Sequence, residues 1–145
     1  MPSSNIARDI RRWFWEKLRP RTLGESGEAA AIRFLRHKGY IIVARQDRGI
    51  LGEIDIVAID GKTVVFVEVK TRRSHDAGRP EEAVDFQKQR RLSRLALGYL
   101  KRHQLLEHRA RFDVVSITWP KGAKRPQIEH FENAFEPTEV GQMFS

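Results

Sequence analysis

Four charged side chains stand inside two strongly apolar segments of this 145-residue chain, where a purely structural strand would carry none. They are Glu53, Asp55, Glu68 and Lys70, within the stretch GEIDIVAIDGKTVVFVEVKT that runs from Gly52 to Thr71. The Asp60-Gly61 dipeptide between the two segments predicts a β-hairpin, because a two-residue type I′ turn needs positive φ at both central positions.

The parity of this hairpin decides which charged side chains meet. If Asp60 and Gly61 form the loop, Asp55 pairs with Phe66, and side chains alternate between the two faces along each strand. Asp55, Glu68 and Lys70 then share one face, with Asp55 and Glu68 as diagonal neighbours. The other face carries only apolar residues: Ile54, Ile56, Ala58, Val65, Val67 and Val69. A three-residue loop would reverse the parity and separate Asp55 from Glu68.

Two carboxylates on an apolar sheet face predict a bound cation. Each is costly to bury, and the two repel one another unless a divalent ion lies between them. Mg²⁺ or Mn²⁺ suits Asp55 and Glu68, because such ions prefer oxygen ligands, and the carbonyl of Val69 could add a third. Lys70 would then orient or deprotonate a water, or offset charge on a phosphate. The alternative is a buried salt bridge with Lys70, but such pairs stabilise poorly compared with apolar replacements.

Composition limits the class of protein. A length of 145 residues and a hydrophobic content of 40% fit one globular domain with a real core. The net charge of +8 predicts attraction to polyanions, either nucleic acid or an anionic membrane surface. The absence of cysteine excludes disulfides and thiolate zinc sites and suits a cytoplasmic protein. We expect neither a signal peptide nor an integral membrane segment.

The segments before the hairpin predict a helix and a first strand. Thr22–Gly39 has a capping box at Thr22-x-x-Glu25 and a glycine where a helix ends. Tyr40–Ala44 is predicted as a strand, and Arg45–Leu51 as a polar loop.

The segments after the hairpin predict one long helix and two strands. The predicted elements are a basic loop at Arg72–Arg79, a helix at Glu81–Gln104, a strand at Arg111–Trp119 and an edge strand at Gln127–Phe131. Both faces of the hairpin carry apolar residues, so helices should cover each face of a layered α/β domain. Asp113 is a lone acid entering its strand, which more often pairs or caps than catalyses.

We divide the chain into a basic helical extension (1–21), a domain (22–136) and a C-terminal tail (137–145). The extension has apolar residues at helical spacing among basic ones. A helix packed on the domain or a frayed tail is the interpretation we favour. A nucleic-acid arm and a membrane-surface helix are the alternatives.

Basic side chains near the hairpin are candidates for binding nucleic acid. The candidates are Arg48, Arg72, Arg73, Lys88 and Arg91. For Lys88 and Arg91, which lie on the predicted helix, an ordinary solvated face and a phosphate-contacting surface explain the charges equally well. Charge clustering alone is weak evidence for either interpretation.

The combination of motifs resembles a known family. Asp55 followed by Glu68-Val69-Lys70 on the next strand looks like the PD-(D/E)xK motif of restriction-endonuclease-like nucleases, with Ile54 in place of the usual proline. Gly27-Glu28, Gly52-Glu53-Ile54-Asp55 and Phe66–Arg72 together resemble the YraN-like family of uncharacterised bacterial proteins. That family usually carries an asparagine in the loop where this chain has Gln46-Asp47-Arg48.

The resemblance implies a restriction-endonuclease-like three-layer α/β/α sandwich with a mixed central sheet, similar to Holliday-junction resolvases. It implies a metal-dependent endonuclease acting on DNA, including branched or repair-intermediate DNA, and a homodimer. It also implies Glu28 as a further metal ligand, with Glu53 in a supporting role. The alternative is a non-catalytic nucleic-acid-binding module of the same fold that acts with a recombination or repair partner.

Overall fold

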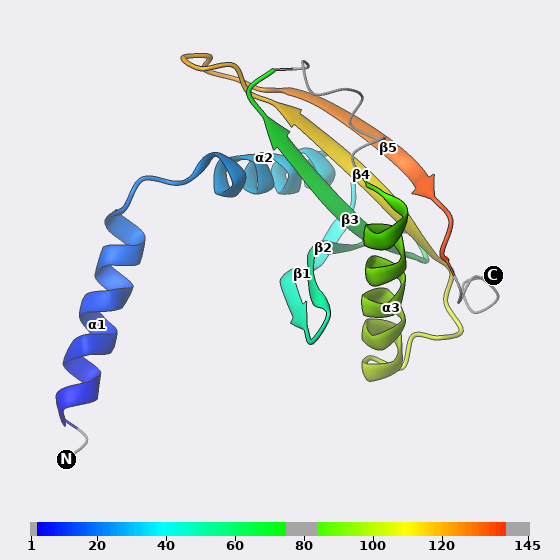
Figure 1. The fold of residues 1–145 in the computed structure, drawn as a ribbon, viewed down its shortest axis with the longest axis horizontal. Helices are drawn as coiled ribbons and strands as arrows, with labels where there is room; N and C mark the ends of the chain where they lie inside the picture. The colour runs from blue at the N-terminus through cyan, green and yellow to red at the C-terminus, as the bar shows by residue number, and fades with distance from the viewer. Residues whose placement is uncertain (1–2, 75–83, 139–145) are drawn as a thin grey trace.

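The computed structural model describes residues 3–74 and 84–138 (Figure 1). Within them the chain forms three helices and five strands. In chain order these are α1 (Ser3–Leu18), α2 (Leu23–His37), β1 (Ile41–Gly49), β2 (Gly52–Asp60), β3 (Thr63–Arg72), α3 (Phe86–Arg102), β4 (Ala110–Thr118) and β5 (Gln127–Phe135). The predicted loop at Arg72–Arg79 and tail at 137–145 lie largely outside the described residues.

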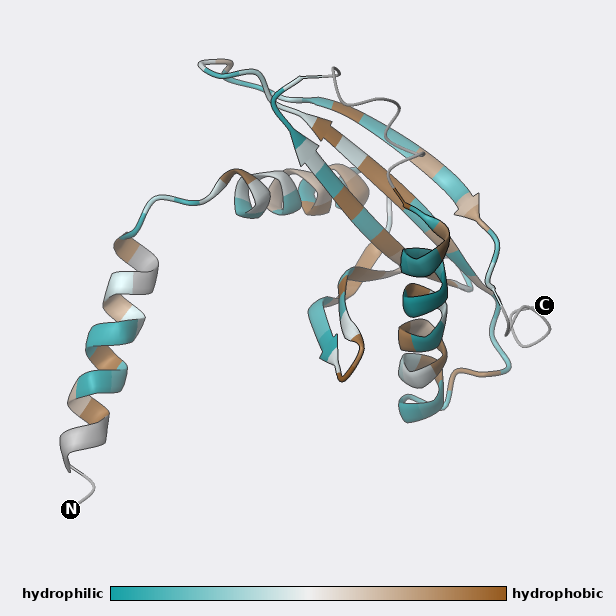
Figure 2. Cartoon of the chain, viewed as in Figure 1, coloured by the Kyte–Doolittle hydropathy of each residue, from teal (hydrophilic) through white to brown (hydrophobic). Residues whose placement is uncertain are grey.

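The five strands form one mixed sheet in the order β1-β2-β3-β4-β5. All neighbouring strands are antiparallel except β3 and β4, which are parallel and connected through α3. The buried parts of β3 and β4 are largely hydrophobic (Figure 2), as expected for strands covered on both faces.

Each face of the sheet packs against one helix. Val65 and Val67 join a core with Leu35 of α2, whereas Val64 and Phe66 join a core with residues of α3. This alternation along β3 separates the two cores, because successive side chains of a strand point to opposite faces. The predicted three-layer α/β/α arrangement with a mixed central sheet is therefore confirmed.

The predicted signals mark the ends of α2. The Thr22 hydroxyl accepts a hydrogen bond from the Glu25 N–H at 3.1 Å, and Gly39 follows the helix with a φ of +95°. In contrast, α3 begins at Phe86, with Asp85 as its N-cap. The first residues of the predicted helix, 81–83, lie outside the described part of the chain.

The hairpin turn lies one residue later than predicted. Asp60 pairs with Thr63, so Gly61 and Lys62 form the loop. Gly61 has a φ of +61° and Lys62 does not have a positive φ, which fits a type II′ turn with glycine at its first central position. The predicted type I′ turn at Asp60-Gly61 is therefore wrong. The register moves by two residues, so the parity is unchanged.

Two strands are longer than the sequence indicated. The polar loop predicted at Arg45–Leu51 is wrong, because β1 continues to Gly49 and only Ile50 and Leu51 form its turn. Similarly, β5 continues past Phe131 to Phe135. Both are edge strands with many exposed side chains. They tolerate polar residues that make a strand look like a loop.

Ile54 was assigned to the wrong face of the sheet. It packs in the α3 core with Val57, whereas Ile56 and Ala58 pack in the α2 core. Regular alternation would put Ile54 with Ile56, so β2 departs from it around Asp55. The irregularity coincides with the end of pairing between β2 and β3, whose last pair is Ile56 with Val67.

Candidate functional site

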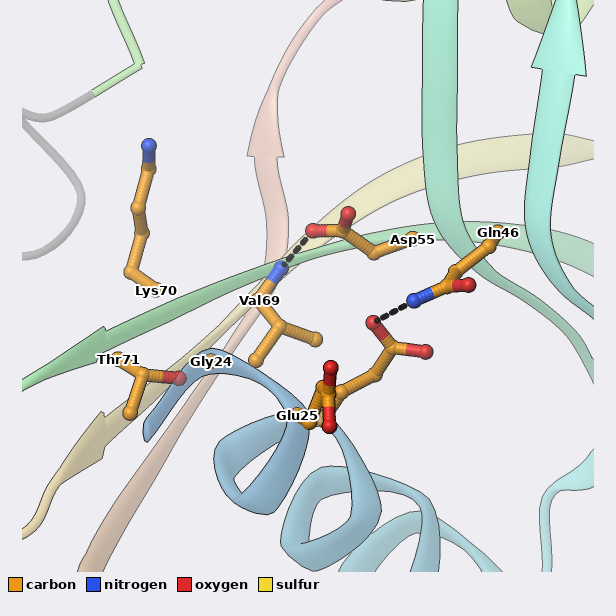
Figure 3. Close-up of a pocket in the computed structure, with 8 residues that line it drawn as sticks. Gly24, Glu25, Gln46, Asp55, Val69, Lys70 and Thr71 are labelled. Carbon is orange, nitrogen blue, oxygen red and sulfur yellow. Dashed lines mark hydrogen bonds between the residues drawn. The ribbon is translucent and has the colours of Figure 1, made fainter. Parts of the chain in front are cut away.

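The candidate site begins where β2 and β3 separate. Beyond the Ile56–Val67 pair, the N–H of Val69 donates to the Asp55 side chain at 2.9 Å (Figure 3). A backbone N–H needs a partner when the ladder ends, and here a carboxylate supplies it. The sheet thereby fixes the position of the Asp55 carboxylate at the opening between the strands.

Asp55 lies in an environment that disfavours its charge. Burial, followed by the charge of Glu68, raises the pKa of Asp55 to about 7, although the Val69 N–H acts in the opposite direction. Two carboxylates that repel in this way are typical of a metal site or of an acid–base pair. The sequence prediction that Asp55 and Glu68 lie close together on the sheet agrees with this interaction.

Glu68 is a buried carboxylate contacted by two lysines. Lys70 Nζ lies 3.5 Å from Glu68 Oε1, and Lys88 Nζ makes a closer ion pair with the same oxygen. Burial, followed by the hydrogen bond with Lys88, lowers the pKa of Lys70. Burial alone would lower the pKa of Lys88, but its contact with Glu68 raises it. The two ammonium groups therefore share one carboxylate.

Glu28 reaches the site from α2, on the other side of the sheet. Its Oε2 accepts a hydrogen bond from Gln46 Nε2 at 3.3 Å, and its Oε1 lies 4.0 Å from Arg45 Nε. Oε1 is buried and has no hydrogen-bond partner. Burial is the main cause that raises the pKa of Glu28. A buried carboxylate oxygen without a hydrogen bond is costly unless a ligand completes its contacts.

A cavity of about 350 Å³ opens between β3 and the first turns of α2. Its lining combines acidic, amide and ammonium groups with exposed backbone (Figure 3). The lining residues are Gly24, Glu25, Glu28, Gln46, Asp55, Val69, Lys70 and Thr71. Asp55 therefore faces both this cavity and Glu68, which belongs to the α3 side.

The donor set fits a hard divalent cation held partly by water. Asp55 and Glu68 offer carboxylate oxygens, and Mg²⁺ often takes only one or two protein carboxylates besides water and phosphate. Within residues 3–74 and 84–138, no three acidic, histidine or cysteine side chains group closely enough to enclose an ion.

The other predicted site residues lie around this centre. Glu53 pairs with Arg48 at 3.2 Å, so neither reaches the cavity lining. Arg73 donates to the Trp119 carbonyl at 3.3 Å, beside the end of β3, where Arg72 pairs in register with Thr118. These placements do not test whether Arg48, Arg72 and Arg73 contact nucleic acid, so those contacts stay predictions.

The predicted residues on α3 are placed differently from one another. Lys88 is half-buried at the site, bound to Glu68, whereas Arg91 is exposed. Arg91 lines a separate groove of about 320 Å³ with Leu51, Gln87, Arg90 and Arg94. Of the two, Arg91 is the one whose guanidinium lies on an open surface.

Sequence reasoning missed two contacts of the candidate site. Lys88 was identified only as a surface cation, because its ion pair with Glu68 joins segments far apart in the chain. Gln46 was not singled out, although it is the hydrogen-bond partner of Glu28. Its φ of +48° is unusual for glutamine and more readily adopted by asparagine. The asparagine usual in this loop of similar sequences was the available signal.

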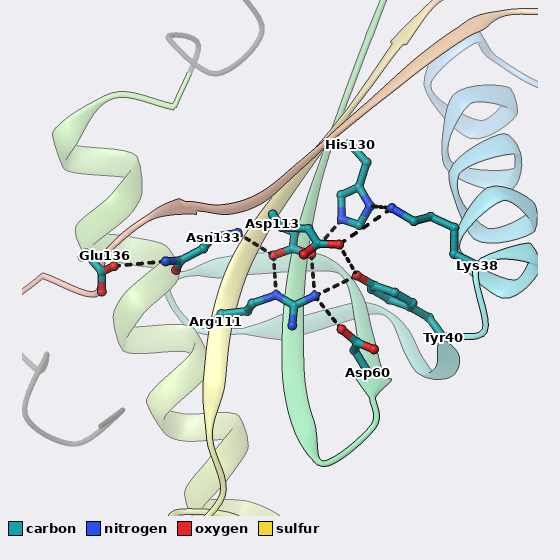
Figure 4. Close-up of polar contacts among 9 residues, drawn as sticks. Lys38, Tyr40, Asp60, Arg111, Asp113, His130, Asn133 and Glu136 are labelled. Carbon is teal, nitrogen blue, oxygen red and sulfur yellow. Dashed lines mark hydrogen bonds and ion pairs between the residues drawn. The ribbon is translucent and has the colours of Figure 1, made fainter.

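A second polar cluster surrounds Asp113, which is fully buried (Figure 4). His130 Nε2 lies 2.7 Å from its carboxylate, Arg111 Nε donates to it at 3.0 Å, and the Asn133 N–H donates at 3.0 Å. Burial alone would raise the pKa of Asp113, but these hydrogen bonds hold it below its usual value. The expectation that Asp113 pairs is confirmed.

This cluster fastens the edge strand β5 to the sheet and to α2. Lys38 Nζ lies 2.9 Å from His130 Nδ1. An ammonium group can only donate, so Nδ1 accepts and Nε2 carries the proton shared with Asp113. Arg111 also donates to Tyr40 at 2.7 Å and pairs with Asp60 at 3.0 Å. The charged side chains of this cluster thus pair with one another, as in a structural network.

The fold and the first site define an α/β protein that brings two carboxylates and two lysines together where its central strands separate. The chain belongs to the uncharacterised protein family UPF0102, whose model matches residues 27–117. The resemblance to the YraN-like family is thereby confirmed.

Relatives from several bacteria match most of the chain. A UPF0102 protein of Geotalea uraniireducens is 50% identical over 116 residues, covering 80% of this chain and 91% of the relative. One from Paenarthrobacter aurescens is 54% identical over 108 residues, covering 74% and 88%. One from Rhodopirellula baltica is 43% identical over 125 residues, covering 84% and 75%.

Proposed function

We propose that this protein is a metal-dependent endonuclease that hydrolyses phosphodiester bonds of DNA. The observation that carries the proposal is the placement of Asp55, fixed by the Val69 N–H, where β2 and β3 separate, together with Lys70 3.5 Å from the buried Glu68 carboxylate. Mg²⁺ or Mn²⁺, when bound, would activate water and polarise the phosphodiester. The net charge of +8 supports a polyanionic substrate.

Each residue of the site has a distinct part in this proposal. Asp55, held by the Val69 N–H, and Glu68 would hold the ion, and Glu28 would face it across the cavity with its oxygen that lacks a hydrogen bond. Lys70, with its lowered pKa, is suited to accept or orient a proton of the attacking water. Lys88 balances the charge of Glu68.

The experiment is a cleavage assay with protein stripped of metal by EDTA and then supplied with Mg²⁺ or Mn²⁺. Labelled linear duplex, single-stranded and four-way-junction DNA test the substrate class. We expect Asp55→Asn, Glu68→Gln and Lys70→Met to reduce the rate by about 10²-fold or more. Asp47→Asn is the matched control, because Asp47 pairs with Arg102 outside the site. Full activity of the three variants would refute the site assignment.

Metal binding provides a readout that does not depend on the substrate. Calorimetric titration with Mn²⁺ should show one site, whose affinity falls about 10-fold or more in Asp55→Asn and Glu68→Gln but not in Asp47→Asn. An unchanged affinity in the two site variants would contradict the proposed ligands.

A non-catalytic DNA-binding module is the second candidate. The Lys88–Glu68 ion pair favours it, because an internal cation already neutralises one of the two carboxylates. This candidate predicts no cleavage by the wild type, together with DNA binding that is indifferent to metal and to Glu68→Gln.

A further inference from the structure

Helix α1 exposes an apolar face. Ile6, Ile10, Trp13, Phe14 and Leu18 recur at spacings of three and four residues, which places them on one side of a helix. The exposed fraction of these five side chains is between 53% and 70%. In Figure 1 the helix stands apart from the sheet, so the interpretation of a helix packed on the domain does not describe this structure.

The opposite face of α1 is basic. Residues 3–21 contain six basic and two acidic residues, a net charge of +4, and four of the basic residues lie within α1. Arg8, Arg11 and Arg12 are exposed. By helical geometry Arg8 and Arg12 lie away from the apolar face, and Arg11 lies at its edge beside Leu18. Arg19, after the helix, pairs with Glu25 at 2.7 Å and so connects the segment to the start of α2.

We propose that α1 binds the surface of membranes containing anionic lipids and lies in the plane of the interface. Only this occupant satisfies both faces, because the apolar side chains enter the acyl region while the arginines contact anionic headgroups. DNA would contact the arginines and leave the apolar face in water. A second copy would cover the apolar face but bring two basic helices together.

The helix would lie on a bilayer and not cross it. None of the helices in the described residues is long and apolar enough to span a membrane. The first residue matched by the family model is Gly27, so α1 precedes the matched region. Membrane binding would therefore be a property added to the domain, independent of the chemistry proposed for Asp55 and Glu68.

Two tryptophans in α1 provide a matched pair for the test. Trp13 belongs to the apolar face, whereas Trp15 is rotated by about 200° and lies among the arginines. The 145-residue chain and its Trp13→Asp and Trp15→Asp variants would be sedimented with two kinds of vesicle. One kind is neutral lipid, and the other is neutral lipid with about 25% phosphatidylglycerol, whose negative surface potential attracts basic segments. We expect the wild type to bind only the anionic vesicles.

The two variants should then differ. Trp13→Asp should weaken binding about 10-fold or more, and Trp15→Asp by less than about 3-fold, because only Trp13 enters the lipid. Absence of vesicle binding, or equal binding to neutral vesicles, would overturn the proposal. So would self-association of the wild type that Trp13→Asp abolishes, since the occupant would then be a second copy. In the absence of vesicles, the rate of DNA cleavage should be the same in the wild type and in both variants. If the wild type does not cleave DNA, neither variant should.

Discussion

At the scale of single residues, the central feature is an acid held in place by a backbone N–H. Asp55 accepts the hydrogen bond from Val69 where the ladder between β2 and β3 ends. This contact fixes the carboxylate although burial and Glu68 oppose its charge. A group that is held firmly in an unfavourable environment is characteristic of functional sites.

The raised pKa of Asp55 predicts a stability cost in the metal-free protein at neutral and higher pH. Between about pH 4 and pH 7 the folded state retains a proton that the unfolded state has released, so stability falls as the pH rises through this window. At about 1.4 kcal/mol for each pKa unit, the full cost is at most about 4 kcal/mol. Asp55→Asn removes the charge and keeps an oxygen for the Val69 N–H.

We therefore expect Asp55→Asn to be more stable than the wild type by about 1–3 kcal/mol at pH 8, and no more stable at pH 4. Urea unfolding in EDTA at pH 4, 6 and 8 measures this, with Asp47→Asn as the control that follows the wild-type profile. A variant that is less stable than the wild type at pH 8 would show that Asp55 is stabilised as an anion.

Strand parity allowed part of this site to be predicted, but not the break in alternation around Asp55 that places Ile54 in the α3 core. Asp55 and Glu68 were predicted as neighbours although the turn was placed one residue too early, since the register error was two residues. The ion pair of Lys88 with Glu68 could not be predicted from the sequence. It depends on how α3 is placed over the sheet, and no local pattern records that.

At the scale of secondary structure, the close approach of α2 to β3 shapes the cavity. A Cβ atom on Gly27 would lie 2.0 Å from Thr71 Oγ1 and 2.8 Å from Thr71 Cβ, so only glycine fits at this contact. Thr71 follows Lys70 on β3. The distance between helix and strand therefore also sets the position of the proposed proton-transfer group.

Gly27→Ala should force α2 away from β3 and destabilise the protein by about 1–3 kcal/mol, the usual cost of overpacking. Gly24→Ala is the matched control in the same helix, because a Cβ at Gly24 would have no atom within 4 Å. It should be neutral or stabilise the protein by up to about 1 kcal/mol through helix propensity. Thermal unfolding of both variants makes the comparison. Equal stabilities would mean that the helix can shift at little cost.

The sequence predicted the bounds of some helices and strands but not of others. Both ends of α2 followed from residue type, because Thr22 acts through its own side chain and Gly39 through its own backbone. The lengths of β1 and β5 did not. Pairing with β2 and β4 continues these edge strands through polar residues, and that pairing is a property of the assembled sheet.

At the scale of the whole molecule, basic residues gather on surfaces of different kinds. Arg90, Arg91 and Arg94 line the groove on α3, whereas α1 carries its arginines opposite an apolar face. Lys88 and Lys70 are engaged with Glu68. The layered α/β fold followed from apolar residues on both faces of the hairpin, but the distribution of its +8 charge required the three-dimensional structure.

The last prediction concerns this distribution and the salt dependence of DNA binding. Each phosphate contact contributes about −0.9 to the slope of log affinity against log salt concentration. Arg91→Gln should reduce the magnitude of that slope by about 0.9, because Arg91 is exposed and lines the groove on α3. Lys88→Gln should change it less, since Lys88 is paired with Glu68.

Arg36→Gln, in the last turn of α2, is the control without effect. Fluorescence anisotropy with duplex DNA between 50 and 200 mM salt, roughly the range over which such slopes are measured, tests all three. Equal slopes for Arg91→Gln and Arg36→Gln would place the DNA on another surface.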